Sequence, residues 1–180
     1  MADVVIEEWR PGQPGSPQLE SDLDDLGGIL HAVVQGGASV GFVLPFSPAE
    51  ARSYWTAKVL RSVRNGSRRM LVARVGEEVI GTVHLNLDTM PNQSHRAEVS
   101  KLLVHPKARR QGVARAMMRE LEAMARELGR TLLTLDTRSG DSAEPLYLSM
   151  GYVLAGAVPR YAQAPGGAEY EATSILYKLL

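Results

Sequence analysis

Residues 97–114 place an apolar strand, a tight turn and the start of a helix in direct succession. Leu and Val dominate the run before Pro106, and a residue that precedes proline is pushed towards extended backbone, so the strand is predicted to end near His105. A helix is predicted to begin near Gly112. The first turn of a helix leaves backbone N–H groups without partners and carries partial positive charge. The segment therefore predicts a place where backbone amides can hold a phosphate or a diphosphate.

Basic side chains surround the predicted turn. Lys107, Arg109 and Arg110 add positive charge, and Gly112 allows a ligand to approach the backbone closely. A plain strand-to-helix connection with its charges in water is the alternative, and the local motif leaves both open. Neither the P-loop pattern nor the Gly-x-Gly-x-x-Gly fingerprint is present, which argues against these two phosphate-binding motifs.

Composition limits the class of protein. The 180 residues and their 44% hydrophobic content suit one domain spanning 1–180 with a full core. Lys plus Arg balance Asp plus Glu at 20 each, which gives no basic surplus for nucleic acid, and cysteine is absent. No run approaches the ~20 apolar residues of a membrane span, and residues 1–10 do not resemble a signal peptide. We therefore predict a soluble cytoplasmic protein that binds neither nucleic acid nor membrane.

Periodicity, caps and turns predict the element order β-α-α-β-β-β-α-β-α-β-β. Strands are expected at residues 4–10, 70–75, 79–87, up to 105, 131–137, 152–158 and 174–179, and helices at 23–34, 48–64, 113–128 and 142–150. This alternation predicts a single α/β (α+β) domain without repeats or linkers.

The turn resembles the acetyl-CoA signature of the GNAT superfamily of N-acetyltransferases. That signature is Arg or Gln, two residues, Gly, one residue, then Gly or Ala, and here Arg109, Gly112 and Ala114 match it after a Leu-x-Val-x-Pro run. The family's usual glycine after the first Arg is Arg110, a mild departure if the position mainly needs a free amide. The predicted element order is also similar to that of this family.

The resemblance implies a fold and a cosubstrate. The fold is a single mixed, mostly antiparallel sheet flanked by helices, in which the motif strand and the strand after the motif helix splay apart. Acetyl-CoA would lie between them, its pantetheine arm bound by the main chain of Leu102, Leu103 and Val104. Its diphosphate would lie against the turn formed by Arg109, Arg110, Gln111, Gly112, Val113 and Ala114.

Acetyl transfer to an amine also needs a hydrogen-bond donor for the carbonyl oxygen, a base for the ammonium and an acid for the leaving thiol. A backbone amide near Leu103 or Val104 is the candidate for the first role. Tyr147 matches the family tyrosine that faces the thioester sulfur and is the candidate acid, although its spacing alone suits a half-buried aromatic.

Glu98 and Asp136 are the candidate bases. In a regular strand Glu98 shares a face with Ser100, Leu102 and Val104, and a bulge would change that register. Structural pairing of either carboxylate with Arg96, Lys101 or Arg138 is the alternative.

The four histidines are scattered over the chain without metal-ligand spacing. No metal is therefore predicted. His84 is better explained as an ordinary strand residue than as a base.

Further segments resemble the tabtoxin resistance acetyltransferases, a group that acetylates the amine of an amino acid toxin. They are residues 35–42, 96–102, 133–137 and 159–161. The resemblance implies a small-molecule amine acceptor, a role in toxin or antibiotic resistance, and a loop at 36–42 that covers the acceptor. Arg96 or Arg160 is then a candidate partner for a substrate carboxylate.

Two other functions remain open: a non-catalytic acyl-CoA sensor and a nucleotide-phosphate binder. Joint presence of Tyr147, Glu98 and Asp136 favours the enzyme. The sequence allows a monomer or a homodimer.

Overall fold

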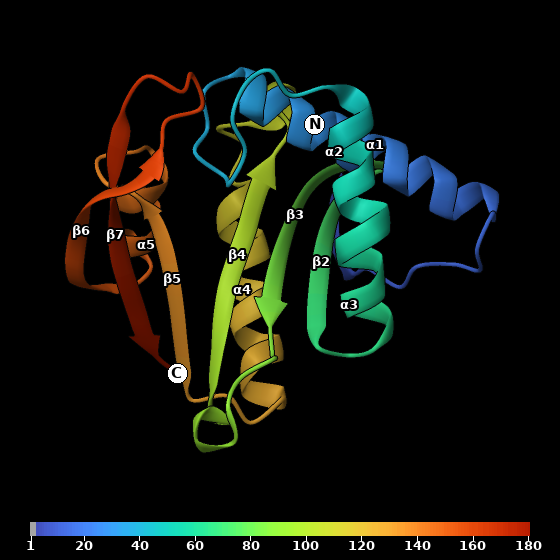
Figure 1. Ribbon diagram of the computed structural model, residues 1–180. Helices are drawn as coiled ribbons and strands as arrows, with labels where there is room; N and C mark the ends of the chain where they lie inside the picture. The colour runs from blue at the N-terminus through green and yellow to red at the C-terminus, as the bar shows by residue number, and fades with distance from the viewer. Residues whose placement is uncertain (1–2) are drawn as a thin grey trace.

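The computed structural model describes residues 3–180, and a seven-stranded sheet forms its centre (Figure 1). Its strands lie in the order β1-β2-β3-β4-β5-β7-β6, and only β4 and β5 run parallel. The strands are β1 (Val4–Glu8), β2 (Arg68–Val75), β3 (Glu78–Asn86), β4 (Arg96–Val104), β5 (Leu132–Arg138), β6 (Val153–Gln163) and β7 (Tyr170–Leu179). The predicted single mixed, mostly antiparallel sheet is confirmed.

Helices cover both faces of the sheet (Figure 1). They are α1 (Pro17–Gln35), α2 (Pro48–Tyr54), α3 (Leu60–Arg64), α4 (Val113–Glu127) and α5 (Ala143–Ser149). The two-residue period of the strands divides the core: Leu71 and Ala73 pack with α4, whereas Met70 and Val72 pack with α1 and α2. No helix of the described residues is long and apolar enough to cross a membrane.

The second predicted helix forms over its whole length but changes type midway. Ser47 and Glu50 make the expected capping box, and Pro48 occupies the first turn. Between α2 and α3 the segment Trp55–Val59 is π-helical, and it buries Trp55 completely. Gly27 of α1 lies where an added Cβ would come 3.4 Å from Arg52 Cα, so its lack of a side chain lets α1 and α2 approach closely.

The last two strands are longer than the sequence pattern indicates. β6 continues through Pro159 to Gln163. A proline cannot donate to a ladder, but β6 is an edge strand whose register with β7 shifts between Val158 and Ala162, so the missing donor costs little there.

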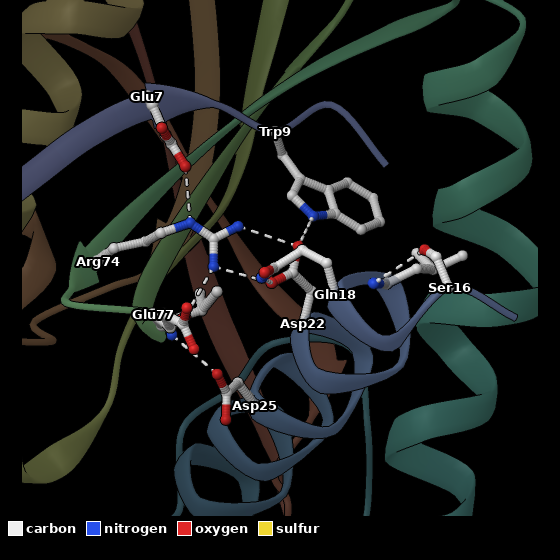
Figure 2. A network of polar contacts seen from close by, with 10 residues as sticks. Glu7, Trp9, Ser16, Gln18, Asp22, Asp25, Arg74 and Glu77 are labelled. Atoms are coloured by element: carbon white, nitrogen blue, oxygen red, sulfur yellow. Dashed lines mark hydrogen bonds and ion pairs between the residues drawn. The ribbon is translucent and has the colours of Figure 1, made fainter. Parts of the chain in front are cut away.

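A buried ion pair joins β1, α1 and β2 (Figure 2). Asp22 is 2% exposed and accepts hydrogen bonds from Arg74 Nη1 at 2.8 Å, Arg74 Nη2 at 2.9 Å and Trp9 Nε1 at 2.8 Å. Burial raises the pKa of Asp22, but the bonds from Arg74, Trp9 and Gln18 outweigh it and hold the pKa below its ordinary value. Asp22 therefore stabilises the fold in its charged form.

Asp22→Asn is expected to lower the free energy of unfolding by about 3 kcal/mol at neutral pH, because it removes the buried carboxylate that both Nη atoms of Arg74 contact and leaves the guanidinium only the half-exposed Glu7 as a carboxylate partner. A lowered folded-state pKa stabilises above the unfolded pKa of about 3.9, and this contribution is lost as the pH falls through the lower folded value. The gap between wild type and variant should therefore shrink at acid pH. Urea denaturation at pH 7 and pH 3 measures both.

Asp24→Asn is the matched control on the same helix. Its carboxylate lies 3.2 Å from Arg52 but is 69% exposed, so the expected loss stays below about 1 kcal/mol. Equal losses for the two variants would contradict a special role for the buried pair.

Candidate active site

A cleft of about 770 Å³ opens where β4 and β5 separate. The two strands pair only at Arg96 with Leu132, Ala97 with Leu133 and Glu98 with Thr134, and they then diverge (Figure 1). Residues 99–104 of β4 line the cleft without a partner on β5. The splayed strands that the family resemblance implies are therefore present, and Leu102, Leu103 and Val104 lie along the open edge.

A β-bulge interrupts β4 at the cleft. Ser100 pairs with His84 and Leu103 pairs with Thr82, so Lys101 and Leu102 together oppose a single residue of β3. Lys101 takes a φ of 51°, in the left-handed region that costs a side-chain-bearing residue about 1–2 kcal/mol. The site stores this strain beside the cleft.

Beyond the bulge, each side chain of β4 lies on the opposite face of the sheet from the one that a regular strand would give it. Val99 packs with the α4 side of the core, whereas Leu103 packs with the α1 side and Leu102 and Val104 with the α4 side. Glu98 therefore does not share a face with Leu102 and Val104, because β4 is not the regular strand for which that arrangement is expected. The physical cause is the extra residue, which shifts the two-residue period by one.

The turn after β4 presents an open helix N-terminus. Gly112 is the N-cap of α4 with a φ of 81°, and no side chain of the described residues caps this helix. By contrast Ser16 caps α1 and Ser47 caps α2. The first amides of α4 are thus free, as the sequence predicts, and they carry the positive end of the helix dipole.

The predicted phosphate-binding residues take different places around this turn. Arg109, Arg110 and Ala114 line the cleft, and Gln111 and Gly112 are exposed beside it. The side chain of Val113 is 4% exposed and belongs to the core, so only its amide faces the turn.

Arg110 has a φ of 60°, which explains why the family prefers glycine there. The position therefore needs left-handed backbone as well as a free amide.

Tyr147 lines the cleft from α5 and is 6% exposed. Burial raises the pKa of its hydroxyl, and the negative charges of Asp136 and Asp141 raise it further. The ring packs edge to face on Tyr152 at 5.8 Å between centroids, which fixes its orientation. At neutral pH this group is a phenol that can donate a proton.

The two candidate carboxylates are not equivalent. Asp136 lies in the lining of the cleft, on the strand that faces the bulge, and its charge reaches Tyr147. Glu98 is exposed and lies at the last position where β4 pairs with β5, outside the lining of the cleft. The structure thus brings Asp136 and Tyr147 together and leaves Glu98 at the edge.

Arg96 and Arg160, the two candidate partners for a substrate carboxylate, contact other residues outside the cleft. Arg96 donates to Thr134 Oγ1 and Gln93 Oε1, both at 3.0 Å, and Arg160 stacks on the ring of Tyr170. Neither lines the cleft.

Lys101 does line the cleft and forms no ion pair with Glu98 or Asp136, the structural alternative that the sequence left open. The sequence allowed for a bulge in this strand, but the left-handed backbone of Lys101 and its place in the cleft were not predicted.

The loop from Gly36 to Gly41 covers one side of the cleft. Arg138 holds it by donating to Gly37 O at 3.1 Å, and the same guanidinium binds Glu171 at 3.2 Å and Asp141 at 3.1 Å. This loop is therefore fixed to β5 and β7 by one side chain. Among residues 3–180 no group of three metal-ligating side chains is found.

A profile of the Acetyltransferase (GNAT) family matches residues 40–152, more than half of the chain. The chain belongs to this family. The matched region of this GNAT protein contains the bulge, the open turn, Asp136 and Tyr147.

Among curated proteins, the chain is 28% identical to an uncharacterized N-acetyltransferase of Azospirillum brasilense, over 81% of this chain and 82% of the relative. It is 32% identical to N-acetyltransferase 8F1 of Rattus norvegicus, over 53% of this chain and 44% of the relative.

Solved structures share the fold of this GNAT chain. A ribosomal-protein-alanine N-acetyltransferase from Brucella melitensis has a TM-score of 0.78 at 22% identity, covering 98% of this chain and 99% of the other. The yncA acetyltransferase of Salmonella typhimurium, solved with its cofactor acetyl-CoA, has a TM-score of 0.74 at 17% identity, covering 98% and 94%.

Proposed function

We propose that this protein is an acetyl-CoA-dependent N-acetyltransferase that acetylates the primary amine of a small molecule by direct attack in a ternary complex. The observation that carries the proposal is one cleft that holds the uncapped N-terminus of α4, Tyr147 and Asp136. A non-catalytic acyl-CoA sensor would need only the first of these. Family membership supports the same reading.

The donor half of the cleft suits CoA. Free amides at the start of α4 and the cations of Arg109 and Arg110 fit a diphosphate. The open edge of β4 offers backbone donors and acceptors to the amides of an extended pantetheine arm.

Gly112→Ala is expected to weaken CoA binding at least 10-fold, because a methyl group would stand where the diphosphate approaches the backbone. In the protein alone an added Cβ meets nothing within 4 Å. The free energy of unfolding should therefore fall by only about 1 kcal/mol, because alanine is strained at a positive φ. Calorimetric titration with CoA and urea denaturation separate the two effects.

Gly129→Ala is the matched control at the other end of α4. Gly129 also has a positive φ, of 69°, and open space around it. It should lose similar stability and keep CoA affinity. Equal weakening of CoA binding by both variants would contradict a diphosphate at Gly112.

The chemistry proceeds by proton transfers at two side chains. Asp136 accepts a proton from the acceptor ammonium, directly or through water, and the free amine attacks the thioester carbonyl. An N–C bond forms and the C–S bond breaks, while a backbone amide near Leu103 or Val104 stabilises the charge on the oxygen. Tyr147 donates its proton to the leaving sulfur. The attacking nitrogen, which is positively charged once the N–C bond has formed, loses its extra proton through water, and this proton restores the Tyr147 hydroxyl.

For the acceptor we propose an amino-acid-like toxin or antibiotic, so that the enzyme serves resistance or detoxification. What motivates this proposal is the resemblance of four short sequence segments to the tabtoxin resistance acetyltransferases, together with the placement of residues 36–41 at the cleft. We further propose that the enzyme acts in the cytoplasm, without nucleic acid, membrane or metal, as a monomer or homodimer.

Mass spectrometry of a broad amine panel, incubated with acetyl-CoA and the protein, tests this function. The panel includes β-lactam amino acids, polyamines and peptide termini. The expected result is the gain of one acetyl group on one class of amine. CoA binding with no acetylation of any amine would support the sensor instead.

A further inference from the structure

Two cations near the cleft lack a carboxylate partner. Lys101 and Arg68 are both partly buried, yet within the chain from residue 3 onward neither comes within 4.0 Å of an Asp or Glu oxygen. Buried charges without a partner are costly, and proteins pair them or use them to bind a ligand of opposite charge. The surroundings of these two side chains therefore indicate what kind of ligand they can bind.

Arg68 is tied to the cleft by a chain of side-chain hydrogen bonds. Its Nε donates to Asn86 Oδ1 at 2.8 Å, and Asn86 Nδ2 donates to Ser100 Oγ at 2.9 Å. Ser100 lines the cleft. The Nη1 atom of Arg68 is fully buried and finds no hydrogen-bond acceptor among the described residues. One face of the guanidinium is thus held in place while a donor remains unused.

Lys101 points to the same region from the β-bulge. Its Nζ lies 5.8 Å from the centre of the Tyr54 ring, and a Cβ added to Gly41 of the covering loop would lie 3.9 Å from it. Tyr54 in turn adjoins Arg68, whose charge lowers the pKa of the Tyr54 hydroxyl against the larger effect of burial. Lys101 and Arg68 therefore flank one tyrosine beneath the covering loop.

His84 lies close enough to Arg68 and Lys101 for their charges to act on it. It is fully buried, packs on Trp55, and has no hydrogen-bond partner on either ring nitrogen among residues 3–180. Burial lowers its pKa, and the charges of Arg68 and Lys101 lower it further. The imidazole stays neutral, so the two cations are the charges that dominate around it.

The Asp136 carboxylate lies between this positive region and Tyr147, the candidate acid. Burial lowers the pKa of Lys101, and Asp136 and Glu98 only partly oppose this, without forming an ion pair with it. Asp136 is also close enough to act on Tyr147. From Asp136 towards Lys101 the lining of the cleft thus changes from acidic to basic.

We infer that Lys101, with the charge of Arg68 behind it, binds an anionic group of the acceptor, so that the acceptor is an amine that also carries a carboxylate. Its ammonium then faces Asp136 and its carboxylate faces Lys101, with opposite charges matched at both ends. The inference rests on the proposed acetyl transfer and specifies its substrate class. Neither Arg96 nor Arg160 is needed for this role.

The test compares amino acids with their carboxamides, which keep the amine and lose the negative charge. Wild-type protein is expected to acetylate the carboxylate member of the preferred pair at least 10-fold more efficiently by kcat/KM. Lys101→Gln should lower the ratio of kcat/KM for the amino acid to kcat/KM for its carboxamide to about 1. Arg68→Gln should act in the same direction, and Arg68→Lys should restore part of the preference.

Lys58→Gln is the charge control, since Lys58 is exposed on the π-helical segment near Tyr54. It should leave the preference unchanged. CoA affinity should be unchanged in all variants, which excludes misfolding as the cause. Equal rates for both members of each pair, or equal loss on both in Lys101→Gln, would overturn the inference.

Failure of acetyl transfer itself gives a different result. If no amine is acetylated, the proposed function is contradicted. Calorimetric titration of the protein–CoA complex with the same pairs then tests whether Lys101 forms an anion-binding site. Binding of a carboxylate member that Lys101→Gln abolishes supports the site. Absence of any preference for carboxylates in binding overturns it.

Discussion

Tyr147→Phe is expected to lower kcat about 100-fold and to leave CoA affinity unchanged, because it removes the acid that protonates the leaving sulfur and keeps the ring. Burial and the charges of Asp136 and Asp141 raise the pKa of this hydroxyl, so the wild-type group keeps its proton throughout the neutral range. Its contribution should therefore show no titration between pH 6 and 9. Steady-state kinetics with acetyl-CoA across that range measures this.

Tyr152→Phe is the matched control. Tyr152 is 2% exposed, packs on Tyr147, and its hydroxyl is buried without a hydrogen-bond partner in the described chain. Loss of that hydroxyl leaves nothing unpaired, so stability and kcat should change little. If both variants lose the same activity, the effect of Tyr147→Phe comes from packing and the proposed acid is wrong.

The fold was predictable because its strongest signals are local. Pro106 ends β4, Gly112 begins α4, and Ser47 with Glu50 begins α2, each through chemistry contained within a few residues. The full extent of β6 was not predictable, since Pro159 is tolerated only because the strand lies at the sheet edge. Edge position depends on the strand order of the whole sheet.

The candidate site was predictable only in part. The open turn and Tyr147 follow from sequence motifs, and the structure places both at one cleft. The left-handed backbone of Lys101 has no local signal, because neither glycine nor asparagine marks it. Its cause is the mismatch between β4 and β3, and this mismatch moves Lys101 into the cleft and leaves Glu98 outside.

Asp136→Asn is expected to lower kcat/KM about 100-fold at pH 7, because Asp136 is the carboxylate that lines the cleft beside Tyr147. An α-amino group has a pKa of about 8, so a free amine becomes abundant in solution at higher pH and no longer needs a base. The deficit of the variant should therefore shrink towards pH 9. The pH profile of kcat/KM distinguishes this result from a structural defect, which would persist at every pH.

Glu98→Gln is the matched carboxylate control. Glu98 is exposed at the last paired position of β4, so we expect less than about 5-fold loss and no change in the pH profile. The opposite ranking, with a large pH-dependent loss in Glu98→Gln and a small one in Asp136→Asn, would assign the base to Glu98. That outcome would require water to carry the proton from the cleft to Glu98, since Glu98 lies outside the lining, where β4 and β5 are still paired. The geometry favours Asp136 because it needs no such relay.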